Sequence, residues 1–193
     1  MRPPSKPLAR LIELLDRLGI PYLIGGSVAS SAHGIPRTTL DVDLVVDMDS
    51  SLIDEFAAEL HADFYADAGL IRESFEHGRA ANLIHLATAW KFDLFPLQPD
   101  EYSRVAFGRR LFREIRPDGE DPIECAVASA EDTILRKLEW YRAGGERSER
   151  QWNDLLGICR TARVSLDLAY LRHWSRQLKL HDLLARLLAE CSL

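Results

Sequence analysis

The sequence lacks the features that mark membrane-spanning proteins, secreted proteins and proteins stabilised by a bound metal. Although 47% of its 193 residues are hydrophobic, no apolar run reaches roughly 18 residues, so we expect no membrane span. Its three cysteines, Cys125, Cys159 and Cys191, are odd in number and far apart, without C-x-x-C spacing. This pattern favours reduced thiols over a disulfide framework or a zinc site. The first residues hold two prolines and no apolar segment, so we expect no signal peptide and a cytoplasmic protein.

Basic residues are also scarce relative to acidic ones. The chain carries 24 Lys and Arg against 30 Asp and Glu, a net charge of −6. Proteins that coat DNA or RNA gain most of their affinity by neutralising phosphates with basic side chains. The composition therefore disfavours a long nucleic-acid track, although a small positive patch for a single RNA end stays open.

Hydrophobic periodicity predicts a mixed front half and a helical back third. Short apolar or alternating runs predict strands at 22–24, 40–46, 83–86, 90–95, 110–115 and 122–127. Helical spacing predicts helices at 8–18, 28–32, 50–60, 67–78, 130–143, 149–162, 167–176 and 178–190. We expect an α+β fold in which residues 1–128 form a short mixed sheet flanked by helices, and residues 129–193 form a helical C-terminal region packed on that core.

A glycine turn lies between the first predicted strand and the next helix. Gly25 and Gly26 have no Cβ, so they permit a tight turn and a close approach of backbone N–H groups to a ligand. The positive N-terminal end of the following helix would face the same place, which is a common phosphate site. Ser27 has two open interpretations, since its hydroxyl suits either a phosphate or the helix cap.

Three aspartates lie on predicted strands. Asp41 and Asp43 are two residues apart, so both carboxylates project from one face of their strand. Asp93 lies among Phe92, Leu94 and Phe95, where an acid is costly unless something pairs with it. If the two strands are neighbours, the three carboxylates form one cluster that suits two Mg²⁺ ions. The alternative is a set of solvated acids, since Lys91 and Asp93 share a face.

This arrangement resembles the polymerase-β-like nucleotidyltransferase superfamily, whose signature is a strand, a Gly-Ser turn, a helix and a strand bearing D-x-D. The R-x-T-x-D-x-D form at 37–43 and the K-F-D-L-F run at 91–95 look most like its AbiEii-like branch, whose members often serve as the toxin of a toxin–antitoxin pair. Residues 130–138 and 150–155 resemble two later helices of that branch, although Gln151 stands where the branch usually has an Asp.

The resemblance implies a Mg²⁺-dependent nucleotidyltransferase that transfers a nucleoside monophosphate from a nucleoside triphosphate, such as ATP, to a hydroxyl acceptor. In that mechanism Asp41 and Asp43 bridge two Mg²⁺ ions. Asp93 binds the metal on the attacking side and helps to deprotonate the acceptor. The three acids would then be both the catalytic residues and the metal ligands.

The same resemblance implies a set of nucleotide-binding residues. The loop of Gly25, Gly26 and Ser27 would hold the β- and γ-phosphates, and Lys137 would pair with the triphosphate. For Arg37 two interpretations stay open, because a cation just upstream of the acids could meet a phosphate or only neutralise the acids. Lys137 also has a plain alternative as a solvated helix residue paired with nearby acids.

Several functional questions stay open at the level of sequence. The acceptor could be an RNA end such as tRNA, a protein hydroxyl or a small molecule, and an antitoxin protein is a further expected partner. One alternative is a non-catalytic interaction protein that keeps the fold and binds nucleotide. Another is a phosphohydrolase that uses the same two-metal chemistry with water as the acceptor.

Overall fold

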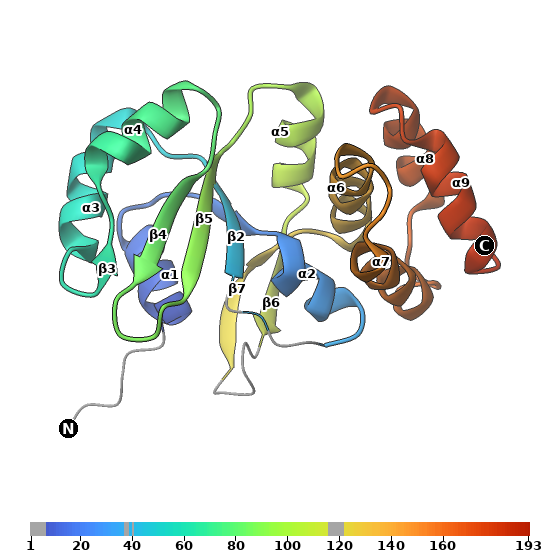
Figure 1. Cartoon of the computed structure of the whole chain (residues 1–193), viewed down its shortest axis with the longest axis horizontal. Coiled ribbons are helices and arrows are strands. Elements are labelled where there is room, and N and C mark those ends of the chain that lie inside the picture. Colours follow the sequence, from blue (N-terminus) through green and yellow to red (C-terminus); the bar gives the residue numbers. More distant parts are fainter. Residues whose placement is uncertain (1–6, 37–38, 40, 116–121) are drawn as a thin grey trace. The chain divides into compact units, whose positions relative to one another are not determined.

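The computed structural model describes residues 7–36, 39, 41–115 and 122–193. The chain divides into two compact units (Figure 1). The first unit comprises Met1–Gly25 and Thr38–Val127, and the second comprises Gly26–Arg37 and Ala128–Leu193. Arg37, one of the predicted nucleotide-binding residues, lies outside the described residues.

The first unit is built on one mixed seven-stranded sheet of order β3-β4-β5-β2-β1-β7-β6. The β2–β5 and β1–β7 pairs are parallel and the remaining pairs are antiparallel. The strands are β1 (Tyr22–Ile24), β2 (Asp41–Val46), β3 (Phe64–Tyr65), β4 (Ala81–His85), β5 (Lys91–Pro96), β6 (Leu111–Ile115) and β7 (Ile123–Val127). Its helices are α1 (Pro7–Arg17), the 3-10 helix η1 (Ser50–Leu52), α3 (Ile53–Leu60), α4 (Ala68–Glu76) and α5 (Glu101–Gly108).

The central strands bury one face and leave the other accessible. Successive residues of a strand point to opposite faces, and burial follows this alternation in β2, β4 and β5. The buried face carries Val42, Leu44, Val46, Ala81, Leu83, Phe92 and Leu94. Phe64 of β3 packs edge-on against Phe92 with ring centroids 5.7 Å apart. The charged residues of these strands and Asn82 therefore share the opposite face, whereas His85 of β4 is buried with the apolar residues.

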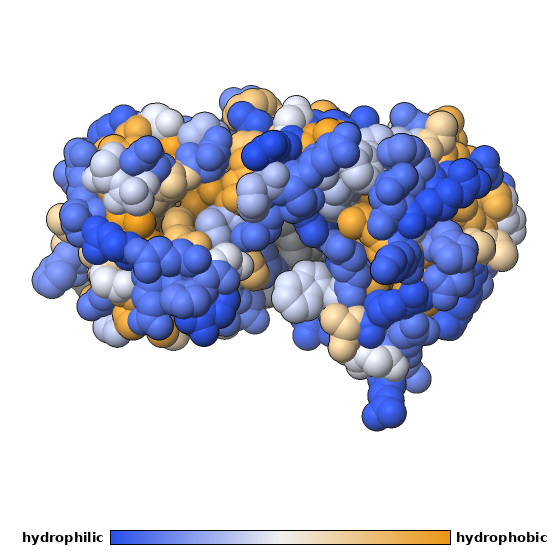
Figure 2. Space-filling model, turned by 90° about the horizontal axis from the view of Figure 1, so that it is seen from above, coloured by the Kyte–Doolittle hydropathy of each residue, from blue (hydrophilic) through white to orange (hydrophobic). Residues whose placement is uncertain are grey.

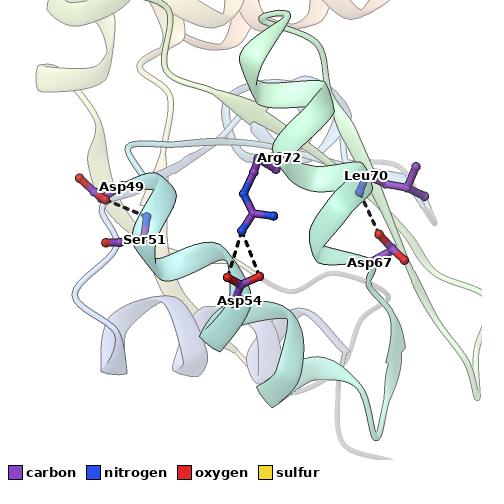
Figure 3. A network of polar contacts seen from close by, with 6 residues as sticks. All are labelled: Asp49, Ser51, Asp54, Asp67, Leu70 and Arg72. Atoms are coloured by element: carbon purple, nitrogen blue, oxygen red, sulfur yellow. Dashed lines mark hydrogen bonds and ion pairs between the residues drawn. The ribbon is translucent and has the colours of Figure 1, made fainter.

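Short-range polar contacts fix the helices of the first unit (Figure 3). The carboxylate of Asp49 accepts a backbone N–H at η1, and that of Asp67 does the same at the start of α4. Arg72 of α4 donates to both carboxylate oxygens of Asp54 on α3 at 3.0 Å. Because acids at N-terminal caps satisfy otherwise unpaired N–H groups, these contacts set where the helices begin.

The second unit is helical in its described part. It contains α2 (Gly26–His33), α6 (Ala130–Ala143), α7 (Glu149–Thr161), α8 (Leu168–Gln177) and α9 (His181–Glu190). α2 packs closely on α7: a Cβ added at Gly34, just after α2, would lie 2.9 Å from the backbone nitrogen of Ile158 and 3.1 Å from the carbonyl carbon of Gly157. A ring nitrogen of His33 lies 2.6 Å from the carbonyl oxygen of Ala128, which it meets as an N–H donor.

The hydrophilic surface and the free thiols agree with what the sequence composition predicts. Hydrophilic residues cover most of the face drawn in Figure 2, and apolar residues form separate patches between them. Cys125, Cys159 and Cys191 are free and buried, and burial raises the pKa of the Cys125 thiol to about 12. None of the described helices is both long enough and apolar enough to span a membrane.

The predicted fold class, a short mixed sheet flanked by helices, is confirmed. Two elements were not predicted: the two-residue strand β3 and the helix α5, which begins after Asp100 caps the backbone N–H of Ser103. The last helix begins at His181 rather than at residue 178. These differences lie in short elements and at helix ends, where hydrophobic periodicity is weakest.

We expect Gly34→Ala to lower the free energy of unfolding by about 1–3 kcal/mol, the range for forcing an extra methyl into a packed interior. The atoms around Gly34 belong to the backbone, so no flexible side chain can move aside. Urea denaturation followed by circular dichroism measures the change. The matched control is Gly108→Ala, because nothing lies within 4 Å of an added Cβ there. Equal stability of the two variants would contradict this close packing.

Candidate active site

The three predicted acids are brought to one face of the sheet by the pairing of β2 with β5. These strands are parallel and in register, with Asp43 opposite Asp93 and Asp41 opposite Lys91. Neighbouring strands lie about 4.8 Å apart, and residues two apart in a strand share a face. The backbone therefore places Asp41, Asp43, Asp93 and Lys91 together on the accessible face, as the hypothesis of one carboxylate group requires.

The carboxylate of Asp93 is held by two neighbouring side chains. Its Oδ2 atom lies 2.9 Å from the ammonium nitrogen of Lys91, and its Oδ1 accepts a hydrogen bond from the amide of Asn82. Asn82 lies directly opposite Asp93 on the antiparallel strand β4. The Asp93 side chain is 20% exposed and that of Lys91 is 43% exposed. This pair therefore borders solvent instead of lying in the core.

Lys91 is a positive charge among these acids. Its hydrogen bond to Asp93 raises its pKa, partial burial opposes this, and the charges of Asp93, Asp41 and Asp43 raise the pKa further. The nearby carboxylates therefore favour the charged form of Lys91. The sequence argument had treated Lys91 only as a reason for Asp93 to face solvent.

The donor set suits magnesium, but the side chains are not gathered around a common point. Mg²⁺ takes oxygen ligands and usually one or two carboxylates plus substrate phosphates, which Asp41, Asp43 and Asp93 could supply. Within the described ranges, however, no three His, Cys, Asp or Glu side chains form a group that could hold a metal ion. Asp93 instead contacts Lys91 and Asn82. The residue types fit the metal, and its binding would require these contacts to rearrange.

The glycine turn begins beside the second acid. The backbone N–H of Gly25 donates to the carbonyl oxygen of Asp43 at 2.9 Å, which extends the β1–β2 ladder by one bond. This N–H is therefore used by the fold rather than by a phosphate. A Cβ added at Gly25 would meet nothing within 4 Å, so the space in front of this residue is open.

The next two residues belong to the second unit. Gly26 has a φ of +54° at the start of α2, a backbone conformation that favours glycine. Ser27 follows as the second residue of the helix. The role of Gly25, Gly26 and Ser27 in binding phosphates stays a prediction.

Lys137 is engaged in an ion pair inside the second unit. Its ammonium nitrogen lies 2.8 Å from Oδ2 of Asp154, and the two side chains are 11% and 14% exposed. The pair joins α6 to α7 and connects the two later segments that resemble the AbiEii-like branch. Of the nearby aromatic residues, Tyr141 and Trp152 are buried with ring centroids 5.1 Å apart, and Trp140 is exposed.

Sequence reasoning missed two residues of the site, Asn82 and the role of Lys91. Lys91 could have been found, because a lysine two residues before an acid on a strand lies on the same face. Asn82 gave no such signal, since its place opposite Asp93 depends on the antiparallel register of β4 and β5.

The sequence matches no protein-family model and no curated protein significantly. Solved structures are nevertheless similar. One is an antigenic nucleotidyltransferase-like protein from Paracoccidioides brasiliensis, with a TM-score of 0.63 and 21% identity over 98% of this chain and 89% of that chain.

The antibiotic-resistance factor ANT(2'')-Ia is also similar, and its solution structure gives a TM-score of 0.52 at 15% identity over 91% of this chain and 94% of that one. A crystal structure of ANT(2'')-Ia with adenylyl-2''-tobramycin gives the same TM-score and identity over 88% and 95%. At these identities the likeness concerns the fold. The chain has the fold of nucleotidyltransferase-like proteins.

Proposed function

We propose that the protein is a Mg²⁺-dependent nucleotidyltransferase that transfers a nucleoside monophosphate from a nucleoside triphosphate to a hydroxyl acceptor. The observation that carries the proposal is the in-register pairing of β2 with β5, which aligns Asp43 with Asp93 and keeps Asp41 on the same face. The nucleotidyltransferase-like fold and the open space before Gly25 support it. A triphosphate donor also fits the expectation of a cytoplasmic protein.

In the proposed reaction the acceptor oxygen attacks the α-phosphorus and the bond from that phosphorus to the bridging oxygen breaks, so pyrophosphate leaves. Asp93 would help to deprotonate the hydroxyl, and Asp41, Asp43 and Asp93 would hold the magnesium. Bound magnesium would supply positive charge that neutralises the triphosphate in the transition state. Gly25, Gly26, Ser27 and Lys137 are the proposed contacts to the phosphates.

The acceptor class is best found by experiment. The proposed alternatives are an RNA end, a protein hydroxyl or a small molecule, and ANT(2'')-Ia with its adenylyl-tobramycin makes a small-molecule hydroxyl a concrete candidate. Purified protein with Mg²⁺ is incubated with each α-labelled triphosphate and, separately, total RNA, cell lysate or a panel of hydroxylated small molecules. Transfer of label to one class identifies the acceptor.

We expect Asp41→Asn and Asp43→Asn each to lower this labelling by about 100-fold or more, because metal stabilisation of the transition state contributes several kcal/mol. Asp47→Asn is the matched control, since Asp47 is an exposed acid just beyond the end of β2. Release of nucleoside monophosphate without a labelled acceptor would instead indicate a phosphohydrolase. Nucleotide binding without either product would indicate the non-catalytic interaction protein.

The proposal includes a toxin role, with an antitoxin protein as partner, which rests on the likeness of residues 37–43 and 91–95 to the AbiEii-like branch. We expect induced expression to slow bacterial growth, and Asp41→Ala or Asp43→Ala to relieve this at equal protein level. Growth curves with immunoblots measure both. Slow growth that persists in both variants would contradict a toxic activity based on the acids.

For Lys137 we expect Lys137→Met to lower the free energy of unfolding by about 2 kcal/mol, because it removes the ion pair with the mostly buried carboxylate of Asp154. A second replacement, Asp154→Leu, should restore most of this stability. If Lys137 also binds the triphosphate, the double variant will be stable and yet bind triphosphate weakly in isothermal titration. Unchanged triphosphate binding by the stable double variant would leave Lys137 with a structural role alone.

A further inference from the structure

Lys91 and Asp93 share a strand and a face, and their side chains form the ion pair at the centre of the candidate site. The separation of 2.9 Å between Nζ and Oδ2 is that of a charge-assisted hydrogen bond. Asp41 faces Lys91 across the β2–β5 pair, and Asp43 faces Asp93. The ammonium group therefore lies where the two strands bring three negative charges together.

The two oxygens of Asp93 are both in use. Oδ1 accepts from Asn82, and Oδ2 accepts from Lys91. Each oxygen keeps a second lone pair, but a metal cation bound to either oxygen would repel the ammonium of Lys91, which lies 2.9 Å from Oδ2. Lys91 is the more easily displaced, because it has a flexible four-carbon stem and its side chain is 43% exposed.

The charge balance of the site indicates what the Lys91–Asp93 ion pair does. Three carboxylates on neighbouring strand positions repel one another, and this repulsion is greatest when no cation lies between them. In the described part of the chain, the ammonium of Lys91 lowers this repulsion, and no three acidic, His or Cys side chains form a group that could hold a metal ion.

We propose that Lys91 is a built-in counter-cation of the active site, which offsets part of the acids' negative charge without metal and leaves Asp93 when the metal ion binds. The inference rests on the proposed function, because it assumes that Asp93 is a metal ligand. Lys91 is then a positioning residue: it holds the Asp93 carboxylate in place and weakens the binding of metal alone.

Mn²⁺, used as a probe for Mg²⁺, provides the test, with binding measured by isothermal titration in the absence of nucleotide. We expect Lys91→Met to lower the Kd for Mn²⁺ by about tenfold, the order expected from removing one unit charge a few Å from a partly exposed site. Lys91→Arg, which keeps the charge, should bind Mn²⁺ more weakly than Lys91→Met. The matched control is Arg72→Met, which removes a cation paired with Asp54 on the helices and should leave the Kd unchanged.

Thermal unfolding gives a second readout. Without divalent ions Lys91→Met should unfold at a lower temperature than the unmodified chain, and added Mn²⁺ should raise its Tm by more than it raises that of the unmodified chain. The Arg72→Met variant should show no such enhanced response to Mn²⁺. A Lys91→Met variant that fails to fold without metal and folds with it supports the same inference.

The outcomes separate the inference from the function on which it rests. Equal or weaker Mn²⁺ binding by Lys91→Met, with binding retained by the unmodified chain, overturns the counter-cation role and leaves the proposed metal site standing. If neither the unmodified chain nor Lys91→Met binds Mn²⁺ at millimolar concentration, the metal site and the counter-cation inference both fail.

Discussion

The parallel pairing of β2 with β5 is the constraint on which the candidate site depends. Parallel strands need a long connection, and here the chain between Val46 and Lys91 forms η1, α3, β3, α4 and β4. The register is locked by apolar residues: Phe92 and Leu94 are fully buried opposite Val42 and Leu44. A shift of β5 by one residue would expose Phe92 and Leu94 to solvent and bury Asp93 in the core. The hydrophobic face thus fixes the position of the acids on the other face.

Clustered or buried acids are tolerable only when cations pair with them, and the two units meet this requirement differently. In the second unit the Lys137–Asp154 pair is mostly buried and links two helices. In the first unit the Lys91–Asp93 pair borders solvent, where its partners can exchange. A buried pair resists separation because each charge would be left uncompensated. A solvent-bordering pair has water available to either partner, which suits a group that must change ligands.

Much of the fold could be predicted because periodicity encodes it locally. Nearby residues alone predict two such elements. Alternation predicts the strand at 41–46, and helical spacing predicts the helix at 130–143. The same locality explains the placement of Asp41 and Asp43 on one face. By contrast, α5 was missed, although Asp100 followed by Ser103 is the kind of cap that marks a helix start.

The remaining parts of the site depend on long-range register, which a single sequence does not display. Nothing local shows that β5 lies beside β2, or that Asn82 faces Asp93 across β4. The side-chain arrangement was equally hidden, because the contact of Asp93 with Asn82 depends on the neighbouring strand β4. Residue types indicated which chemistry to expect at the site, whereas its contacts required coordinates.

The route of the chain between its two units has a consequence for synthesis on the ribosome. Residues 26–37 belong with residues 128–193, and His33 meets the carbonyl of Ala128, 95 positions later. The partners of α2 in α6 and α7 therefore emerge only after the whole sheet has been translated. Until then its apolar residues Val28 and Ala29, buried in the finished protein, lack their final neighbours. A fragment truncated before residue 128 would stay in that incomplete state permanently.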